Sequence, residues 1–307
     1  MISPKHAYAT SRLQTEAKQA GLVLETVDIR DLAAQNFRVN IGKYQTLFVR
    51  QSYPYDAQVV ALAKQFQAQG KRVIDQNIAQ GDLGLGKFDM YQKLQRGEFP
   101  IPKTEFFHNA PRPPLKIRGG EGVILKWNYG FGGRGTFFVK GKSQSSAILK
   151  KYPKEELLLQ EFISADYEYK VITVGFKALP VILRLKIRDS GFKPDLNKCE
   201  MISLLNLPSG QPHPIPPRYR GGKKGEVTGF KDYQQSPALQ KQIKEKIITL
   251  AEQSSRVLSR ELAKVDILQA GDRLYILEVN RWPGLSFFEK KTGFNVAREF
   301  VKYLQKG

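Results

Sequence analysis

Cysteine and histidine are scarce in this chain. Cys199 is the single cysteine among 307 residues, which excludes an intrachain disulfide and every zinc or iron–sulfur site built from cysteines. The three histidines, His6, His108 and His213, lie too far apart for a helical HExxH zinc site. The sequence therefore argues against soft-metal chemistry.

Long apolar runs are also missing. No stretch approaches the roughly 20 apolar residues of a membrane span. The first residues, MISPKHAYATSR, lack the apolar run of a signal peptide. We therefore expect a cytoplasmic protein with no membrane partner.

Acidic residues are few. The chain has 49 Lys and Arg against 29 Asp and Glu, which gives a formal net charge of +20. Such an excess predicts either a solvated basic surface or an anionic partner, namely nucleic acid, nucleotide phosphates or an acidic peptide. The length and the 41% hydrophobic content fit two or three globular domains and exclude collagen, coiled coils and wholly disordered chains.

The first part of the chain alternates between helical and extended patterns. Apolar residues at helical spacing, closed by glycine, predict amphipathic helices, and short β-branched runs between them predict strands. The helices are expected over 9–20 and 57–69, and the strands over 22–29, 46–51 and 71–76. This alternation is typical of a small open α/β sheet, whose first strand is missing or reduced to Met1 and Ile2.

The rest of the chain has a mixed α+β pattern. Helices are expected over 87–97, 143–152, 236–260 and 294–304, strands over 122–128, 135–140, 157–163 and 169–188, and a hairpin over 264–280. Residues 203–231 hold five prolines and a basic cluster that includes Arg218, Arg220, Lys223 and Lys224. They predict a long loop.

A glycine-rich segment, Gly130-Phe-Gly132-Gly-Arg-Gly135, matches the GxGxxG pattern of dinucleotide-binding turns. The residues after it predict a strand, whereas a dinucleotide-binding turn must open a helix. The remaining interpretations are a loop whose N–H groups cover a polyphosphate, or a plain hairpin turn. Just before it, strand alternation places Lys126 opposite the apolar face, where a lysine suits phosphate but is also common as a solvated side chain.

Two carboxylates and an amide form the strongest candidate site. Glu278 and Asn280 are two residues apart and share a strand face, and the expected hairpin places Asp266 across from Ile276 with Glu278 as its diagonal neighbour. These are hard oxygen ligands that suit magnesium, although a polar outer hairpin face would look the same. After the strand LLLQEFI, whose backbone could meet adenine, Glu168 could accept hydrogen bonds from a ribose.

Five sequence blocks stand in a characteristic order. They are GKFDM leading to FPIPKT, then VILKWNYGFGGRG, then LLLQEFI with YEYKVITVG, then VDIL, then LEVNRWPGLSFFEKKTGFNVA. In order and spacing they resemble the ATP-grasp superfamily, in particular its RimK-like branch of ribosomal-protein glutamate ligases, over most of the chain. The resemblance implies a small N-terminal open α/β domain (1–85) and two α+β lobes (86–160 and 161–307) that enclose ATP.

The resemblance also implies roles for single residues. Lys87 and Lys126 would hold the phosphates, under a loop made by Gly132, Gly133, Arg134 and Gly135. The adenine hinge would be Glu161 and Phe162, the ribose acceptor Glu168, and the magnesium ligands Asp266, Glu278 and Asn280, for two magnesium ions with manganese as an alternative. Relatives carry an Arg…Asn pair and then a glycine pair after the strand VILRLKIR. This chain departs from that pattern, which leaves Arg184, Lys193 and Arg220 as candidates for the catalytic arginine or lysine at the phosphate.

The implied reaction is an ATP- and magnesium-dependent carboxylate–amine ligation through an acyl phosphate, with no side-chain nucleophile. Glutamate is the expected amino acid, and the acceptor is an amine or carboxylate, for example on a ribosomal or acidic protein. A ligase of small amino acids or peptides is the first alternative. A basic RNA-binding protein on a degenerate ATP-grasp scaffold is the second, and nucleic acid contact through the basic surface belongs with it.

Overall fold

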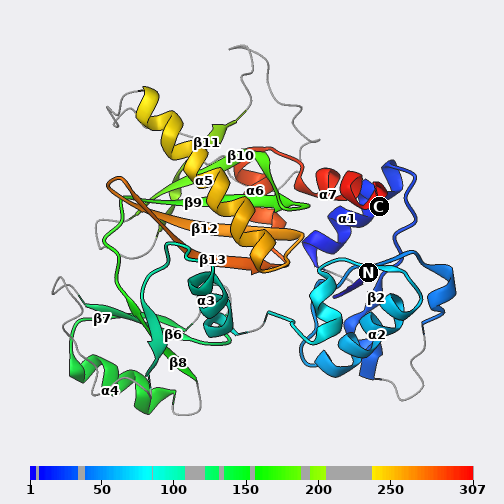
Figure 1. Cartoon of the computed structure of the whole chain (residues 1–307), viewed down its shortest axis with the longest axis horizontal. Coiled ribbons are helices and arrows are strands. Elements are labelled where there is room, and N and C mark those ends of the chain that lie inside the picture. The colour runs from blue at the N-terminus through cyan, green and yellow to red at the C-terminus, as the bar shows by residue number, and fades with distance from the viewer. Residues whose placement is uncertain are drawn as a thin grey trace.

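The computed structural model describes residues 1–4, 7–33, 39–84, 86–107, 122–130, 135–152, 156–187, 194–204 and 237–306. Their helices and strands form three groups, built around two small parallel sheets, a four-stranded sheet and a five-stranded sheet respectively (Figure 1). No helix among these residues combines the length and the apolar character that crossing a membrane requires.

The first group is a small α/β unit with short parallel strands. Its helices are α1 (Tyr8–Gln19) and α2 (Asp56–Ala68), and its strands are β1 (Ile2–Ser3), β2 (Val27–Asp28), β3 (Thr46–Leu47) and β4 (Arg72–Val73). β1 pairs with β2 and β3 with β4, both in parallel, and a bridge from Ile2 to Val49 links the two pairs. Three turns of 3-10 helix complete it: Ile29–Ala33, Ile41–Lys43 and Gln76–Gln80.

The second group is a four-stranded sheet with the order β5-β8-β6-β7. Its strands are β5 (Thr104–Phe106), β6 (Val123–Trp127), β7 (Thr136–Val139) and β8 (Leu157–Glu161), and helix α4 (Lys142–Lys151) packs beside β7. Val123, Leu125, Val139 and Leu159 form its apolar core, so alternation turns Lys126 to the other face.

The third group is a five-stranded antiparallel sheet with the order β11-β10-β9-β12-β13. The strands are β9 (Tyr167–Val174), β10 (Lys177–Ile187), β11 (Pro194–Ser203), β12 (Leu262–Ala270) and β13 (Arg273–Arg281). Helix α5 (Pro237–Val257) covers one face, where Ile243 and Ile247 meet Val171 and Val265, and α3 (Lys87–Arg96) adds Met90 and Leu94 to that core.

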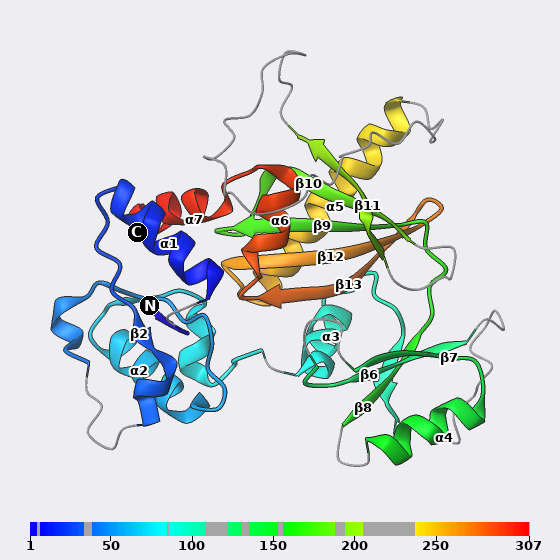
Figure 2. The ribbon, with the colours of Figure 1, turned by 180° about the vertical axis from the view of Figure 1, so that it is seen from behind.

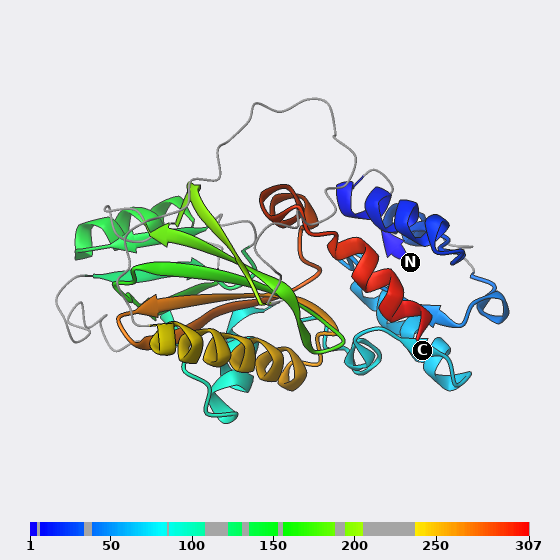
Figure 3. The ribbon, with the colours of Figure 1, turned by 90° about the horizontal axis from the view of Figure 1, so that it is seen from above.

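The other face of this sheet is covered at one end only. There α6 (Leu285–Thr292) and α7 (Val296–Gln305) pack against Ile172 and Leu262, and α1 lies alongside α7, which brings both chain ends together (Figures 2 and 3). The opposite end of the same face carries charged side chains instead. This arrangement leaves the polar end to face the four-stranded sheet and the α/β unit.

Most predicted elements are present, with four corrections. The strands expected over 22–29, 46–51 and 71–76 are two residues long, and Val23 is 82% exposed outside the sheet. The run 169–188 is two strands, because Gly175 and Phe176 both have positive φ and turn the chain back. Strand β11 and helix α6 were not predicted. Residues 205–231 of the predicted loop lie outside the described residues.

Candidate active site

The charged end of the five-stranded sheet gathers side chains from three neighbouring strands on one face. Lys170 of β9 is the ladder partner of Asp266 in β12, and Asp266 is in turn the partner of Glu278 in β13. Lys264 and Asn280 form the next pair along the same face. Glu168, two residues before Lys170, completes the group.

A β-bulge places Glu278 beside Asp266. Ile267 pairs with Ile276, but Asp266 pairs with Glu278, so Leu277 is an extra residue on β13. In a regular ladder Leu277 would oppose Asp266 and Glu278 would share the face of Val265, which packs in the apolar core. The predicted register, with Asp266 across from Ile276, is therefore wrong, although the prediction that these side chains lie close together is confirmed.

Lysines neutralise each carboxylate of this group. Asp266 has the Nζ of Lys264 at 3.0 Å and that of Lys170 at 3.3 Å, and Lys170 also pairs with Glu168. The Nζ of Lys87 lies 2.5 Å from Glu278 Oε1. The amide Nδ2 of Asn280 donates to Asp266 Oδ2 at 3.4 Å. Three strands, β9, β12 and β13, and one helix, α3, thus contribute to one array in which lysines and carboxylates lie next to each other.

Burial and neighbouring charge shift the pKa values in this array. Burial lowers the pKa of Lys126 to about 8, although Glu278, Glu168 and Asp266 favour its charged form. Burial alone would raise the pKa of Glu278, yet Lys87, Lys264 and Lys126 lower it to about 2. Burial and the Asp266 charge raise the pKa of Glu168 against the opposing effect of Lys170. Neighbouring lysines thus favour the charged form of Glu278, whereas burial disfavours the charged forms of Lys126 and Glu168.

Lys126 reaches the array from the four-stranded sheet. It is 7% exposed, and its Nζ lies 3.5 Å from the hydroxyl of Tyr91 in α3. As predicted, it projects from the face opposite the apolar core of that sheet. A buried lysine whose nearest partner is a phenol retains the capacity to bind an anion.

Asn128 holds the start of α3 against β6 and so positions Lys87. Its backbone oxygen accepts a hydrogen bond from Lys87 N at 3.0 Å, and its Oδ1 accepts one from Phe88 N at 2.9 Å. Its Nδ2 donates to Glu156 Oε2 at 3.0 Å. The first residue of α3 is thereby fixed with its ammonium at Glu278.

The predicted adenine hinge lies at the end of β8. Glu161 accepts a hydrogen bond from Lys103 N at 3.1 Å through its side chain, and its own N–H donates to Lys103 O at 2.8 Å. Phe162 packs on Phe138 of β7 with ring centroids 4.6 Å apart. These two residues thus lie at the C-terminal end of an inner strand, next to the strand that carries Lys126.

Gly135 closes the glycine-rich segment at the start of β7. It has φ +72, and a Cβ there would come within 2.1 Å of the Trp127 ring, so no other residue fits without movement. Its carbonyl accepts a hydrogen bond from Trp127 N at 2.8 Å. The other predicted members of this segment, Gly132, Gly133 and Arg134, lie outside the described residues.

The candidates for the phosphate arginine do not join the array. Arg184 lies on the face of the sheet that α5 covers, because it pairs in the ladder with Tyr169 and its side chain bonds to Glu200. Its guanidinium lies 4.7 Å from the Tyr167 ring centroid. Lys193 and Arg220 lie outside the described residues. The structure therefore separates Arg184 from the other predicted site residues.

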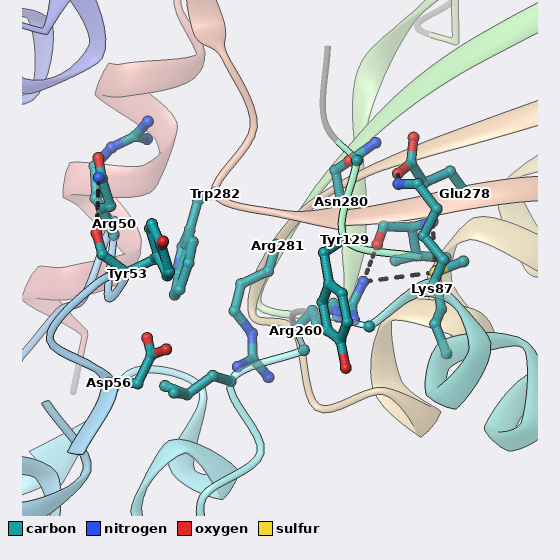
Figure 4. Close-up of a pocket in the computed structure, with 17 residues that line it drawn as sticks. Arg50, Tyr53, Asp56, Lys87, Tyr129, Arg260, Glu278, Asn280, Arg281 and Trp282 are labelled. Atoms are coloured by element: carbon teal, nitrogen blue, oxygen red, sulfur yellow. Dashed lines mark hydrogen bonds and ion pairs between the residues drawn. The ribbon is translucent and has the colours of Figure 1, made fainter. Parts of the chain in front are cut away.

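A cavity of about 870 Å³ opens from the array toward the α/β unit. Figure 4 shows Lys87, Glu278 and Asn280 at one end and Arg50, Tyr53 and Trp282 at the other. The residues from the α/β unit were not predicted, because the contact between distant segments leaves no local signal in the sequence. Lys170 and Lys264 were missed for another reason: strand alternation alone would have placed them with Asp266.

The donor set fits a hard divalent cation. The described residues hold no cluster of three or more His, Cys, Asp and Glu side chains suited to a metal, so the set consists of Asp266 and Glu278, completed by the amide oxygen of Asn280. Two carboxylates and an amide oxygen match the ligand preference of magnesium. The lysines paired with them, Lys87 and Lys264, lie where positive charge is favourable.

Comparisons with known proteins agree with this geometry. Residues 233–304 match the family model of the RimK-like ATP-grasp domain. A probable alpha-L-glutamate ligase of Marinomonas sp. (strain MWYL1) is 23% identical over 97% of this chain and 92% of its own. The chain is thus similar to RimK-like ATP-grasp proteins over most of its length.

Solved structures confirm the ATP-grasp fold. The ATP-grasp ligase PsnB, complexed with minimal precursor, Mg and ADP, superposes with a TM-score of 0.67 at 11% identity and covers 99% of this chain and 96% of its own. The RimK domain protein ATP-grasp from Sphaerobacter thermophilus DSM 20745 gives 0.61 at 16% identity, with coverage of 99% and 98%. The predicted fold class, ATP-grasp, is confirmed, and the proteins that this chain resembles are named as ATP-grasp and glutamate ligases.

Proposed function

We propose that this chain joins glutamate to a carboxylate of a peptide or protein through an acyl phosphate. The observation that carries the proposal is the cavity, which has Lys87, Glu278 and Asn280 at one end and the α/β unit at the other. A volume of about 870 Å³ accommodates an amino acid together with the end of a peptide chain. The name of the curated relatives supplies glutamate as the first amino acid to test.

The proposed chemistry follows from the charges. A carboxylate that attacks the terminal phosphate of ATP is an anion approaching an anion, so positive charge must be in place before the reaction. We assign this role to Lys87 and Lys126, which face the proposed metal-ligand carboxylates from helix α3 and strand β6. The acyl phosphate then loses phosphate when the amine attacks, and the amide bond forms. No side-chain nucleophile is required.

Asp266, Glu278 and Asn280 would hold magnesium, which when bound supplies positive charge against the phosphate oxygens. Glu161 and Phe162 are proposed to border the adenine, Glu168 to accept the ribose hydroxyls, and Gly135 to anchor the loop that covers the phosphates. We also keep the division into 1–85, 86–160 and 161–307 as a proposal, supported by the separate sheets and cores.

Neither the family match nor the relatives support RNA binding as an alternative to ligase activity. The version that remains open is a ligase of small amino acids or peptides, and one experiment separates it from protein modification. The purified chain, ATP and magnesium are incubated with glutamate and with candidate acceptor proteins, and products are read by intact-mass spectrometry. Added glutamate masses on a protein support the proposal, whereas ADP release with amino acids alone and no protein product supports small-molecule ligation.

A further inference from the structure

Arg50 is a cation at the far end of the cavity with almost no partner. Its guanidinium can donate five hydrogen bonds, yet its contacts among the described residues are two long ones, from Nη1 and Nη2 to Pro283 O at 3.5 Å each. Its Nε is shielded from solvent and has no acceptor. Burial lowers the pKa of Arg50 to about 10, and no described carboxylate counteracts this.

The other two arginines that line the cavity have stronger partners for their guanidinium groups than Arg50 has. Arg281 has Asp75 Oδ2 at 2.9 Å and donates to Asp82 O at 2.6 Å. Arg260 donates to the backbone oxygen of Val279. Arg260 resembles Arg50 in having an Nε without an acceptor and a pKa lowered to about 10 by burial. Arg260 and Arg281 are, however, only 4% and 5% exposed, whereas Arg50 is half-buried, so Arg50 is the one of the three that a molecule in the cavity can reach.

Trp282 provides a second free donor at this end. Its indole Nε1 is buried without an acceptor, and its backbone has φ +59, a conformation that bulky residues rarely adopt. Tyr53 beside it is 70% exposed, which is unusual for an aromatic side chain. Figure 4 shows Arg50, Tyr53 and Trp282 gathered at the same end. Two unused donors and exposed aromatic surface together describe a site for an organic anion.

We propose that Arg50 binds a carboxylate of the amino acid or peptide substrate that is not activated during the reaction. The activated carboxylate must reach the phosphate at the Glu278 end of the cavity, so a carboxylate held by Arg50 at the opposite end stays intact. The guanidinium fork matches the two oxygens of a carboxylate. This inference rests on the proposed ligase function, because it uses that reaction to tell the two carboxylates apart.

Binding and turnover of the full-length chain test this proposal separately. L-Glutamate, L-glutamine, glutamate α-amide, and an acidic peptide with a free or an amidated C-terminus are titrated calorimetrically into the protein with Mg²⁺ and a non-hydrolysable ATP analogue. If glutamine does not bind, Arg50 holds the side-chain carboxylate. If glutamate α-amide does not bind, it holds the main-chain carboxylate, and if the amidated peptide does not bind, it holds the C-terminal carboxylate of a peptide. The wild type is expected to bind at least one free carboxylate.

Arg50→Gln is expected to weaken binding of that carboxylate about tenfold to a hundredfold, and Arg50→Lys is expected to restore part of the loss. In turnover the KM for the amino acid or peptide should rise by the same factor, while kcat and the KM for ATP change less than about threefold. Lys64→Met removes one positive charge from the exposed face of α2 and serves as the matched control. It should leave every value unchanged.

Loss of folding is not expected to explain weaker binding by Arg50→Gln. Because the guanidinium lacks a partner, Arg50→Gln should leave the thermal unfolding midpoint of the ligand-free protein unchanged or raise it. Equal carboxylate binding by wild type and Arg50→Gln overturns the proposal, as does a wild type that binds none of the five probes. A wild type that binds a probe through Arg50 but shows no ADP release with any amine leaves the carboxylate site intact and refutes the ligase function instead.

Discussion

Asp266 and Glu278 lie directly opposite each other on neighbouring strands, although the regular register of their hairpin would turn Glu278 into the apolar core. The extra residue, Leu277, is held in place by its carbonyl, which accepts a hydrogen bond from Tyr91 OH at 2.7 Å. Two like charges in direct opposition repel, and Lys87, Lys170 and Lys264 offset this repulsion. The bulge therefore places two carboxylates side by side, and cations nearby stabilise this arrangement.

We expect Lys264 to compete with magnesium for Asp266. Its Nζ lies 3.0 Å from Asp266 Oδ2, where a metal ion would also bind. Lys264→Ala should tighten Mn²⁺ binding about threefold to tenfold in the presence of ADP, measured by electron paramagnetic resonance as free Mn²⁺. Lys177→Ala, which removes an exposed lysine paired with Glu252, is the control and should have no effect. Weaker Mn²⁺ binding by Lys264→Ala would show that this lysine orients the ligand instead.

Lys126 destabilises the nucleotide-free protein. Its folded pKa of about 8 lies below the ordinary value of 10.5, so between these pH values the unfolded chain binds more protons and the free energy of unfolding rises with pH. Below pH 8 Lys126 is charged in both the folded and the unfolded chain, so the full loss of stability caused by its burial remains. Lys126→Met should therefore be more stable at pH 7 by about 3 kcal/mol, and this gain should vanish as the pH rises from 8 to 10.5.

Urea unfolding at several pH values in EDTA measures this effect. Lys170→Met is the contrasting variant, because Lys170 pairs with both Glu168 and Asp266 and its loss leaves buried carboxylates unpaired. It should be less stable than wild type at pH 7. A destabilised Lys126→Met at pH 7 would contradict the assignment of Lys126 as an unpaired buried cation.

Gly135 is required by the Trp127 ring as well as by its backbone angle. Gly271 has a similar φ of +61 but open space around its Cβ position, so Gly271→Ala measures the cost of the angle alone. We expect about 1 kcal/mol for Gly271→Ala and about 3 kcal/mol for Gly135→Ala in urea unfolding. Equal losses would mean that the collision at 2.1 Å is relieved by movement of the ring.

We expect Arg184 to stabilise the sheet and not to take part in the reaction. It stacks on Tyr167 and pairs with the half-exposed Glu200 on the face away from the carboxylates. Arg184→Ala should keep kcat within about threefold of wild type and lose about 1 kcal/mol of stability, measured by ADP release and urea unfolding. A loss of activity of a hundredfold or more, with the fold intact, would restore Arg184 as the phosphate-binding arginine.

The sequence allowed prediction of the parts of the site that depend on local periodicity. Lys126 and the pair Glu278 and Asn280 could be assigned to strand faces because alternation has a period of two. Asp266 was placed near Glu278 correctly, but in the wrong register, since a bulge leaves no mark on the alternation of apolar residues. The roles given to these residues stay predictions.

Other parts depend on contacts between distant segments and could not be predicted. Arg50 follows a short strand in the α/β unit and lines the same cavity as Trp282, which is more than 200 residues further along the chain. Arg184 was chosen for its charge, whereas its face is fixed by pairing with β9 and β11. The strands of the α/β unit were predicted too long because their apolar residues also pack outside the sheet, as Leu22 and Leu24 do.

The central claim is that the carboxylates opposed across β12 and β13 support ATP-dependent ligation of an amino acid. The most direct test is ADP release by the purified chain with ATP and magnesium, across the twenty amino acids singly and in pairs, with and without peptide acceptors. Wild type is compared with Glu278→Gln, which keeps the size of the side chain and removes its charge. We predict turnover that requires glutamate and falls at least about a hundredfold in Glu278→Gln. Equal ADP release by the two proteins, or none under any combination, would contradict the account.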